Sequence, residues 1–285
     1  MNLFINLIKN QIGKIKNWFG WSRPKLKFPL EIHLADHCNL NCKGCSHYSP
    51  ISNLSFKTVE ELKLPLKRLS HYNYFFNEIR LLGGEPLLNP NLLEIISYVR
   101  LCFPLTTIKI ITNGILLLNE KIIDNNFWKT LEKNGIILSI TLYPIKLNYE
   151  KIFELCSINK IKYIIYANKS THNAFNLFLL DALKSGSKKN FYYCRDSICY
   201  QLVGNKIFTC PQCAYVNKLN SKFGTNFVIS KNDYLDINNM NLFKLIIFQN
   251  KPKSFCRYCV FPRVNIDWDK SKMAKDEWIK EVQAK

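Results

Sequence analysis

The sequence lacks several features that would place it in other classes of protein. It has no run of 18 or more apolar residues, which excludes a transmembrane helix. It has neither basic stretches interleaved with aromatic residues nor a basic recognition helix, so we expect no nucleic-acid partner. Its 11 cysteines are odd in number and clustered at short spacings, which argues against a secreted disulfide framework. Metal ligation in a reducing compartment fits better, and we expect a cytoplasmic protein.

Acidic residues are scarce beside the basic ones. There are 40 lysines and arginines against 21 acidic residues, a formal net charge of +19. A positive net charge of this size favours binding of anionic partners, but it does not indicate which kind of anion. We expect an anionic small-molecule or lipid-linked substrate. The hydrophobic share of 47% over 285 residues is enough for one large packed domain, with or without a small second one.

Residues 1–28 form a distinct amphipathic, basic segment. Apolar residues recur in it at helical spacing, with lysines between them and Trp18 and Trp21 near the end. This pattern fits a helix lying in a membrane interface, which would make the protein peripheral at the inner face of the membrane. A helix that packs on the protein itself or on a partner has the same periodicity. Both interpretations stay open.

Residues 29–167 alternate short apolar runs with helical stretches. The predicted strands are Leu30–Ala35, Glu78–Leu82, Thr106–Ile111, Ile136–Leu142 and Ile161–Tyr166. The predicted helices are Thr58–His71, which begins with a capping box to Glu61, Pro90–Cys102, Asn119–Lys133 and Tyr149–Ile158. The alternation predicts an α/β domain with a parallel sheet. In such folds, chemistry gathers at the carboxyl ends of the strands.

Three cysteines follow the first predicted strand. Cys38, Cys42 and Cys45 are spaced so that a loop can wrap one face of a cubane cluster, whose usual ligands are thiolates. Three ligands leave one of the four irons open to a small chelating molecule. The alternative is a structural zinc site completed by His37 or His47, although such a site usually has four protein ligands.

The Cys-x3-Cys-x2-Cys motif resembles that of the radical S-adenosylmethionine (SAM) superfamily. The resemblance covers about residues 29–167 and implies a partial (β/α)6 barrel, a 4Fe–4S cluster, SAM, and a reductant such as flavodoxin or ferredoxin. Gly83-Gly84-Glu85 resembles the motif whose backbone and acid hold the SAM amine, and glycines let a backbone approach a ligand closely. Asn113 and Ser139 resemble contacts to the SAM carboxylate or ribose. The family often has an aromatic residue just before the third cysteine; this chain has Gly44, and Tyr48 is the candidate substitute near adenine.

Residues 168–285 contain a second group of cysteines. Cys210-x2-Cys213 and Cys256-x2-Cys259 alone are compatible with a zinc ribbon. The segment from Gly204 to Cys210 resembles the hairpin of twitch and SPASM extensions, which implies a small α+β extension with an auxiliary 4Fe–4S cluster. A twitch pattern assigns Cys194, Cys210, Cys256 and Cys259 as ligands. Cys199 and Cys213 are spare, and either could replace one of the four. A final surface helix is expected within Asp267–Lys285.

The resemblance implies that SAM is cleaved reductively and that the resulting radical takes a hydrogen atom from a substrate. A single auxiliary cluster favours electron transfer, hence oxidation or epimerisation of a sugar or amino alcohol, which could be nucleotide- or lipid-linked in surface polysaccharide biosynthesis. One alternative is maturation of a ribosomal peptide, although only about 28 residues precede the barrel. The other is a non-catalytic Fe–S or zinc scaffold at a membrane. The sequence identifies no catalytic acid or base.

Overall fold

The computed structural model describes residues 28–167, 171–172, 178–179, 186–262 and 266–280. The predicted amphipathic segment therefore lies outside the described residues, except for Phe28. Among the described helices, none is both long and apolar enough to cross a membrane.

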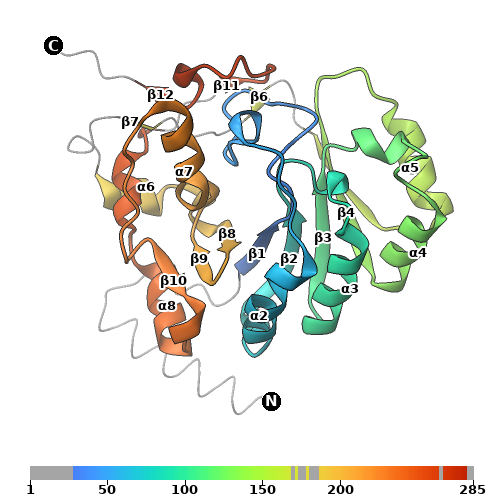
Figure 1. The fold of residues 1–285 in the computed structure, drawn as a ribbon, viewed down its shortest axis with the longest axis horizontal. Coiled ribbons are helices and arrows are strands. Elements are labelled where there is room, and N and C mark those ends of the chain that lie inside the picture. The colour runs from blue at the N-terminus through green and yellow to red at the C-terminus, as the bar shows by residue number, and fades with distance from the viewer. Residues whose placement is uncertain (1–27, 168–170, 173–177, 180–185, 263–265, 281–285) are drawn as a thin grey trace.

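An eight-stranded sheet in the order β10-β9-β8-β1-β2-β3-β4-β5 runs through the molecule (Figure 1). Its strands are β1 (Phe28–His33), β2 (Phe76–Leu82), β3 (Thr107–Thr112), β4 (Ile136–Leu142), β5 (Tyr163–Ala167), β8 (Tyr200–Val203), β9 (Lys206–Phe208) and β10 (Tyr234–Asp236). The six strands from β8 to β5 are parallel, whereas β9 and β10 are antiparallel additions. The mixed α/β fold predicted from the sequence is confirmed.

Helices follow the first four strands and cover one face of the sheet (Figure 1). They are α2 (Val59–Ser70), α3 (Leu92–Cys102), α4 (Asn125–Lys133) and α5 (Tyr149–Ile158). The predicted capping box of α2 is present between Thr58 and Glu61. The helix expected from Asn119 begins only at Asn125, because the side chain of Asp124 accepts a hydrogen bond from the Phe127 amide and caps it there.

Successive side chains of these strands point alternately to a buried apolar face and to a polar inner face of the sheet. Leu30 and Ile32 are fully buried in the core, while Glu31 lies on the opposite face. The strand register sets Glu31 beside Arg80 and Arg80 beside Lys109. Arg80 pairs with Glu31 at 3.0 Å, and Arg80 and Lys109 both pair with Glu78. A row of paired charges therefore crosses the inner face of three strands.

The C-terminal part joins the same sheet. Gly204, at a φ of 55°, turns β8 into β9, and Cys210 follows, so the predicted glycine turn, short strand and cysteine are all present. β8 pairs in parallel with β1. The expected domain boundary at residues 167 and 168 thus does not separate two sheets, because the free edge of β1 takes its partner strand from beyond that boundary.

Further elements of this part are α6 (Ser187–Tyr192), α7 (Pro211–Phe223), α8 (Leu242–Asn250) and a 3-10 helix, η8 (Ser254–Tyr258). The expected surface helix within Asp267–Lys285 is wrong for the described residues 266–280. These form only the short strands β11 (Ile266–Asp267) and β12 (Ile279–Lys280), with a 3-10 turn, Lys275–Glu277, between them. β11 pairs with β6 (Thr171–His172), and β12 with β7 (Phe178–Leu179).

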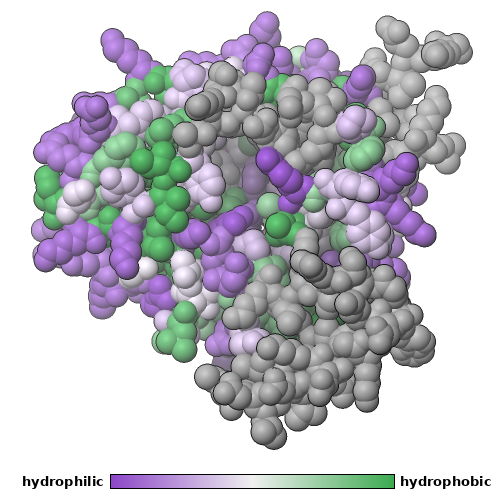
Figure 2. Space-filling model, turned by 180° about the vertical axis from the view of Figure 1, so that it is seen from behind, coloured by the Kyte–Doolittle hydropathy of each residue, from purple (hydrophilic) through white to green (hydrophobic). Residues whose placement is uncertain are grey.

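The opposite edge of the sheet is apolar and accessible. Ile164 and Ile165 of β5 are 38% and 42% exposed. Seen from behind, the side of the molecule that carries α4 and α5 shows hydrophobic side chains gathered among hydrophilic ones (Figure 2).

Candidate functional site

The first three cysteines lie on one loop between β1 and the 3-10 turn η1 (Ser49–Ile51). Cys38 and Cys42 are each 8% exposed, and Cys45 is half-buried. Burial, with a smaller contribution from the neighbouring Cys45, raises the pKa of the Cys38 and Cys42 thiols to about 12. The structure therefore brings the three predicted ligands together on one loop, and metal binding must release the protons of the Cys38 and Cys42 thiols.

Gly83 and Gly84 pack directly against this loop. The Gly84 amide donates to the Ala35 carbonyl at 2.6 Å, and the Glu85 amide donates to the His37 carbonyl at 2.9 Å. A Cβ atom on Gly84 would lie 2.0 Å from the His37 carbonyl oxygen. We expected the missing side chains to admit a ligand. The backbone of residues 35–38 fills that space instead, so the two glycines set the position of the cysteine loop.

Glu85 is fully buried and bound to its own chain. Its carboxylate accepts hydrogen bonds from the Thr112 hydroxyl at 2.7 Å, the Asn113 amide at 3.0 Å and the Leu87 amide at 3.2 Å. Burial raises the pKa of this carboxyl to about 7 against the opposing effect of these bonds. Glu85 therefore fixes the turn that follows β3, rather than presenting a free acid to a ligand amine.

Asn113 directly follows the carboxyl end of β3, and Ser139 lies in the middle of β4. The Asn113 side-chain amide donates to Asn39 at 2.8 Å and contacts the Cys38 sulfur at 3.7 Å. Ser139 is fully buried on the inner face, and among the described residues its hydroxyl finds no hydrogen-bond partner. An unpaired buried hydroxyl is unfavourable, so a polar ligand atom would stabilise it.

Tyr48 does not lie where the sequence analysis expected it. Its side chain is 0% exposed, and its hydroxyl donates to the Gln212 carbonyl at 3.3 Å. The ring packs in a hydrophobic cluster of the C-terminal part, together with Cys213 and Cys259. An adenine ring has no access to it there, because the C-terminal part covers this side chain completely.

Two tryptophans contact the cysteine loop and were missed by the sequence analysis. Trp268 donates from Nε1 to the Cys42 sulfur at 3.3 Å, and Trp278 donates from Nε1 to the Cys45 carbonyl at 3.0 Å. The segment around Trp268 also pairs with the loop, since the Lys43 amide donates to the Asp269 carbonyl. The polar composition of Asp267–Lys285 suggested a surface element and gave no signal of this contact.

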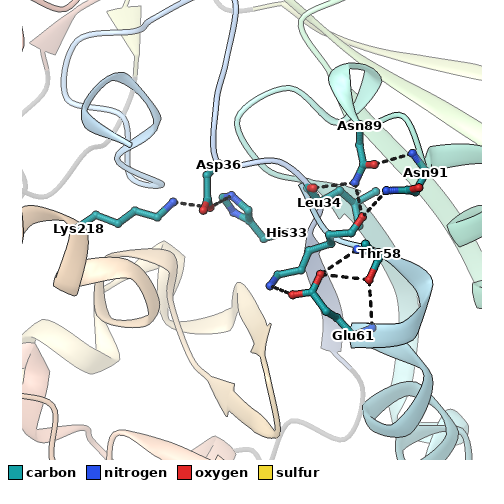
Figure 3. A network of polar contacts seen from close by, with 9 residues as sticks. His33, Leu34, Asp36, Thr58, Glu61, Asn89, Asn91 and Lys218 are labelled. Atoms are coloured by element: carbon teal, nitrogen blue, oxygen red, sulfur yellow. Dashed lines mark hydrogen bonds and ion pairs between the residues drawn. The ribbon is translucent and has the colours of Figure 1, made fainter. Parts of the chain in front are cut away.

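The segment after β1 is held from two sides (Figure 3). Lys218, reaching from α7, pairs with Asp36 at 2.6 Å, and Asp36 also contacts His33 at 3.0 Å. Although burial opposes it, hydrogen bonds from His33 and Lys218 hold the pKa of Asp36 well below its usual range. On the other side, Asn89 donates to the Leu34 carbonyl at 2.8 Å. These bonds position the loop that begins at the end of β1.

His47 is engaged with His33 and not with the cysteines. The two Nδ1 atoms are 3.1 Å apart, and burial lowers the pKa of both imidazoles. One of the two histidines considered as a fourth zinc ligand therefore already has a partner.

Five cysteines line one pocket in the C-terminal part: Cys194, Cys210, Cys213, Cys256 and Cys259. Cys199 is not among the residues that line it. Burial, and then the charge of Glu31, raises the pKa of the Cys199 thiol, which places Cys199 near the charged row of the sheet. Of the two spare cysteines, the structure brings Cys213 to the predicted ligands and leaves Cys199 apart.

The pocket is built by the start of α7 and by η8. Cys210 is the N-cap residue of α7, and Cys213 lies in its first turn, where the helix dipole favours thiolates. Asn190 of α6 donates to the carbonyls of both Cys256 and Cys259, at 2.7 and 2.8 Å. These contacts hold segments that are distant in sequence around a single thiol-lined space.

The donor sets fit iron–sulfur clusters. Within the part of the chain that is described, no three His, Cys, Asp or Glu side chains converge as the ligands of a single metal ion would. A cubane cluster does not require convergence on one point, because each thiolate binds a different iron. Three thiols on one loop fit a cluster with one open iron, and five thiols are enough for a second cluster.

Comparison with known proteins agrees with this architecture. Residues 32–142 match the family described as the Radical SAM superfamily, so this part of the chain is a Radical SAM domain. Members of this family use a 4Fe–4S cluster and SAM. A GTP 3′,8-cyclase of Clostridium perfringens (strain SM101 / Type A) is 30% identical over 141 residues, which are 48% of this chain and 41% of that protein.

Two further comparisons define how far the likeness extends. The human molybdenum cofactor biosynthesis protein 1 is 39% identical over 93 residues, 31% of this chain and 14% of that protein. The chain thus spans less than half the length of these relatives. The crystal structure of BtrN in complex with AdoMet and 2-DOIA is 17% identical, covers 83% of this chain and 94% of that chain, and has a TM-score of 0.52. This likeness concerns the fold alone, and it extends over both parts of the chain.

Proposed function

We propose that the protein is a radical SAM enzyme that cleaves SAM reductively and removes a hydrogen atom from a polar substrate. The observation that carries the proposal is the loop of Cys38, Cys42 and Cys45, fixed by Gly83–Glu85 onto the turn at Asn113. A scaffold without catalytic activity has no need for this second layer of contacts around three thiols.

Cys38, Cys42 and Cys45 would hold the 4Fe–4S cluster, while the side chains of Asn113 and Ser139 would face SAM, and Gly83 and Gly84 would keep the cysteine loop in place behind them. When bound, these groups supply the 5′-deoxyadenosyl radical and so the hydrogen abstraction. Glu85 keeps the Asn113 turn in register with the cysteine loop. The Trp268 hydrogen bond to the Cys42 sulfur stabilises the thiolate form of that ligand.

The C-terminal pocket is proposed to hold an auxiliary 4Fe–4S cluster in a twitch-like extension. Cys210, Cys256 and Cys259 are ligands in this proposal, with Cys194 as the fourth and Cys213 as the candidate to replace it. Such a cluster would accept one electron from a substrate radical, which makes the net reaction a two-electron oxidation. Epimerisation is redox-neutral and would instead need a hydrogen atom returned to the substrate radical. A zinc ion in the same pocket would not accept an electron.

The inner face of the sheet favours a substrate that carries hydroxyl or amino groups. The charged row of Glu31, Glu78, Arg80 and Lys109 lies on this face, and its four charges cancel. The Arg80 side chain is 27% exposed and Lys109 is 15% exposed. The row therefore has no net charge but offers hydrogen-bonding groups. A sugar or an amino alcohol would be bound through such hydrogen bonds. A nucleotide or lipid carrier, and peripheral membrane contact by residues 1–28, rest on the sequence alone.

The test is anaerobic reconstitution followed by assay. About eight irons per chain would support two 4Fe–4S clusters, and about four would support one. Nucleotide sugars and amino sugars are then incubated with SAM and a low-potential reductant. We expect 5′-deoxyadenosine to form together with an oxidised or epimerised sugar. Formation of 5′-deoxyadenosine with every sugar unchanged would contradict the substrate class, and turnover of a short peptide would favour the peptide-maturation alternative.

A further inference from the structure

Tyr48 occupies an unusual position on the cysteine loop. It follows Cys45 by three residues, and its amide donates to the Cys45 carbonyl at 3.0 Å. Its backbone has a φ of 56° and a ψ of 28°, the left-handed region that a bulky residue rarely adopts. Such a conformation persists only where the surroundings hold it.

The surroundings that hold Tyr48 belong to the second cysteine site. The ring lies in the hydrophobic cluster that contains Cys213 and Cys259, and the hydroxyl donates to the carbonyl of Gln212. Gln212 sits between Cys210 and Cys213 in the chain. One buried side chain thus joins the backbone beside the first set of thiols to the backbone within the second set.

Trp278 strengthens the same connection. Its indole also donates to the Cys45 carbonyl, and its ring centroid lies 6.4 Å from that of Tyr48. Trp278 is 3% exposed within the same hydrophobic cluster. The Cys45 carbonyl therefore accepts hydrogen bonds from two groups that are both anchored in the C-terminal part.

We propose that Tyr48 couples metal loading of the two cysteine sites, so that each loaded site slows metal loss from the other. Metal bound by Cys210, Cys256 and Cys259 ties the start of α7 to η8, and these two elements form the wall around Tyr48. When metal holds these two elements together, they keep Tyr48 in its left-handed conformation and so keep Cys45 in place. By linkage, a loaded first site stabilises the second site equally.

The inference rests on the proposed function only in that both sites hold metal, and its test needs no turnover. Metal release from anaerobically reconstituted protein into a chelator is followed for three proteins. Cys256→Ala/Cys259→Ala retains the first site, Cys38→Ala/Cys42→Ala/Cys45→Ala retains the second, and the wild type has both. Without coupling, the wild-type release curve equals the sum of the two single-site curves. We expect the faster wild-type phase, in which both sites are still loaded, to be roughly fivefold slower or more than in the single-site proteins, the lower range of ordinary coupling between sites.

Tyr48→Gly tests the residue itself, because glycine adopts the left-handed backbone without strain but lacks the ring. We expect its release curve to match the sum of the single-site curves within about twofold. Tyr200→Phe is the matched control, since Tyr200 is equally buried but lies among the residues of the main core, and it should keep the slow release. An additive wild-type curve, or slow release that persists in Tyr48→Gly, would overturn the proposal.

Tyr48→Phe removes the hydroxyl and its hydrogen bond to Gln212 while keeping the ring, and it tests the proposal if Tyr48→Gly does not fold. We expect release at least about twofold faster than in the wild type, and a rate equal to the wild type would then count against the coupling. Absence of SAM cleavage in a protein that shows coupled release would reject the proposed function and leave this inference standing.

Discussion

At the scale of single residues, the motif after β2 works mainly by shaping the loop that holds the cysteines. Gly84 is close enough to His37 that no side chain fits between them, and the Glu85 carboxylate accepts a hydrogen bond from the Asn113 amide in the turn after β3. The motif thus acts one layer behind the ligands. Substitutions in the motif should therefore be harmful when they disturb its packing against the cysteine loop, and not because they remove a contact with a cofactor.

Replacing Gly84 by alanine tests this interpretation. The new Cβ would meet the His37 carbonyl at 2.0 Å, and backbone cannot move aside as a flexible side chain can. We expect a loss of about 1–3 kcal/mol in the free energy of unfolding, typical of overpacking, and a parallel loss of iron at the first site. Urea unfolding and iron analysis measure the two effects.

Gly186→Ala is the matched control, because no atom of the described residues lies within 4 Å of the position of its Cβ and its φ is −78°. Its free energy of unfolding should change by no more than about 0.5 kcal/mol. Equal stability and iron content in the two alanine variants would contradict the account of Gly84.

The sequence identified cysteines more readily than their partners. Cys38, Cys42 and Cys45 carry a spacing that can be recognised in one segment. Trp268 and Trp278 act through contacts with residues more than 200 positions away, and neither periodicity nor spacing encodes such contacts. The role of Tyr48 was misjudged for the same reason, since its burial depends on the C-terminal part.

At the scale of elements, β1 to β5 and their helices followed from apolar runs alternating with amphipathic stretches. The strand β8 did not, because four residues in a cysteine-rich region carry too little pattern, and its place beside β1 is decided by tertiary pairing. A surface helix was expected within Asp267–Lys285, yet the backbone around Lys270 pairs with the cysteine loop instead.

The charged row that joins β2 to β3 gives a pH-dependent prediction. Burial favours the neutral acid at Glu78, but the hydrogen bond from Lys109 and the charge of Arg80 outweigh it and lower the pKa of Glu78 below its ordinary 4.5. An acid whose pKa is lowered by folding stabilises the fold above its ordinary pKa and loses this contribution as the pH falls through the lowered value.

Lys109→Met should therefore be less stable than the wild type by about 1–3 kcal/mol at pH 7, and this difference should shrink as the pH falls below 4.5. Urea unfolding of the metal-free protein across this range measures it. Lys151→Met, which removes an exposed pair with Glu154, should change stability by less than about 1 kcal/mol at every pH. A deficit of Lys109→Met that is unchanged at low pH would contradict this explanation.

At the scale of the whole molecule, one sheet carries both cysteine sites. The parallel strands present the first site at their carboxyl ends, and β8 and β9 lead directly to α7 and the second site. The two sites are therefore parts of one framework, although the sequence suggested two consecutive domains. The likeness to BtrN, which extends over 83% of this chain, agrees with this arrangement.

The two spare cysteines differ in where this framework places them. Cys213 lines the second pocket and Cys199 does not. We expect Cys199→Ala to keep the full iron content, and Cys256→Ala to lose up to about four irons per chain. Iron and sulfide analysis after reconstitution checks this, and loss of a cluster in Cys199→Ala would mean that the pocket is assigned incorrectly.

The central claim is that Cys38, Cys42 and Cys45 hold the cluster that cleaves SAM. Its most direct measurement is the formation of 5′-deoxyadenosine from SAM by the reconstituted, reduced protein and by its Cys38→Ala/Cys42→Ala/Cys45→Ala variant. The account predicts cleavage by the wild type and none above background in the variant, which should still retain iron at the second site. Cleavage that persists in the variant, or its absence from a wild type that carries a full complement of iron, would contradict the account.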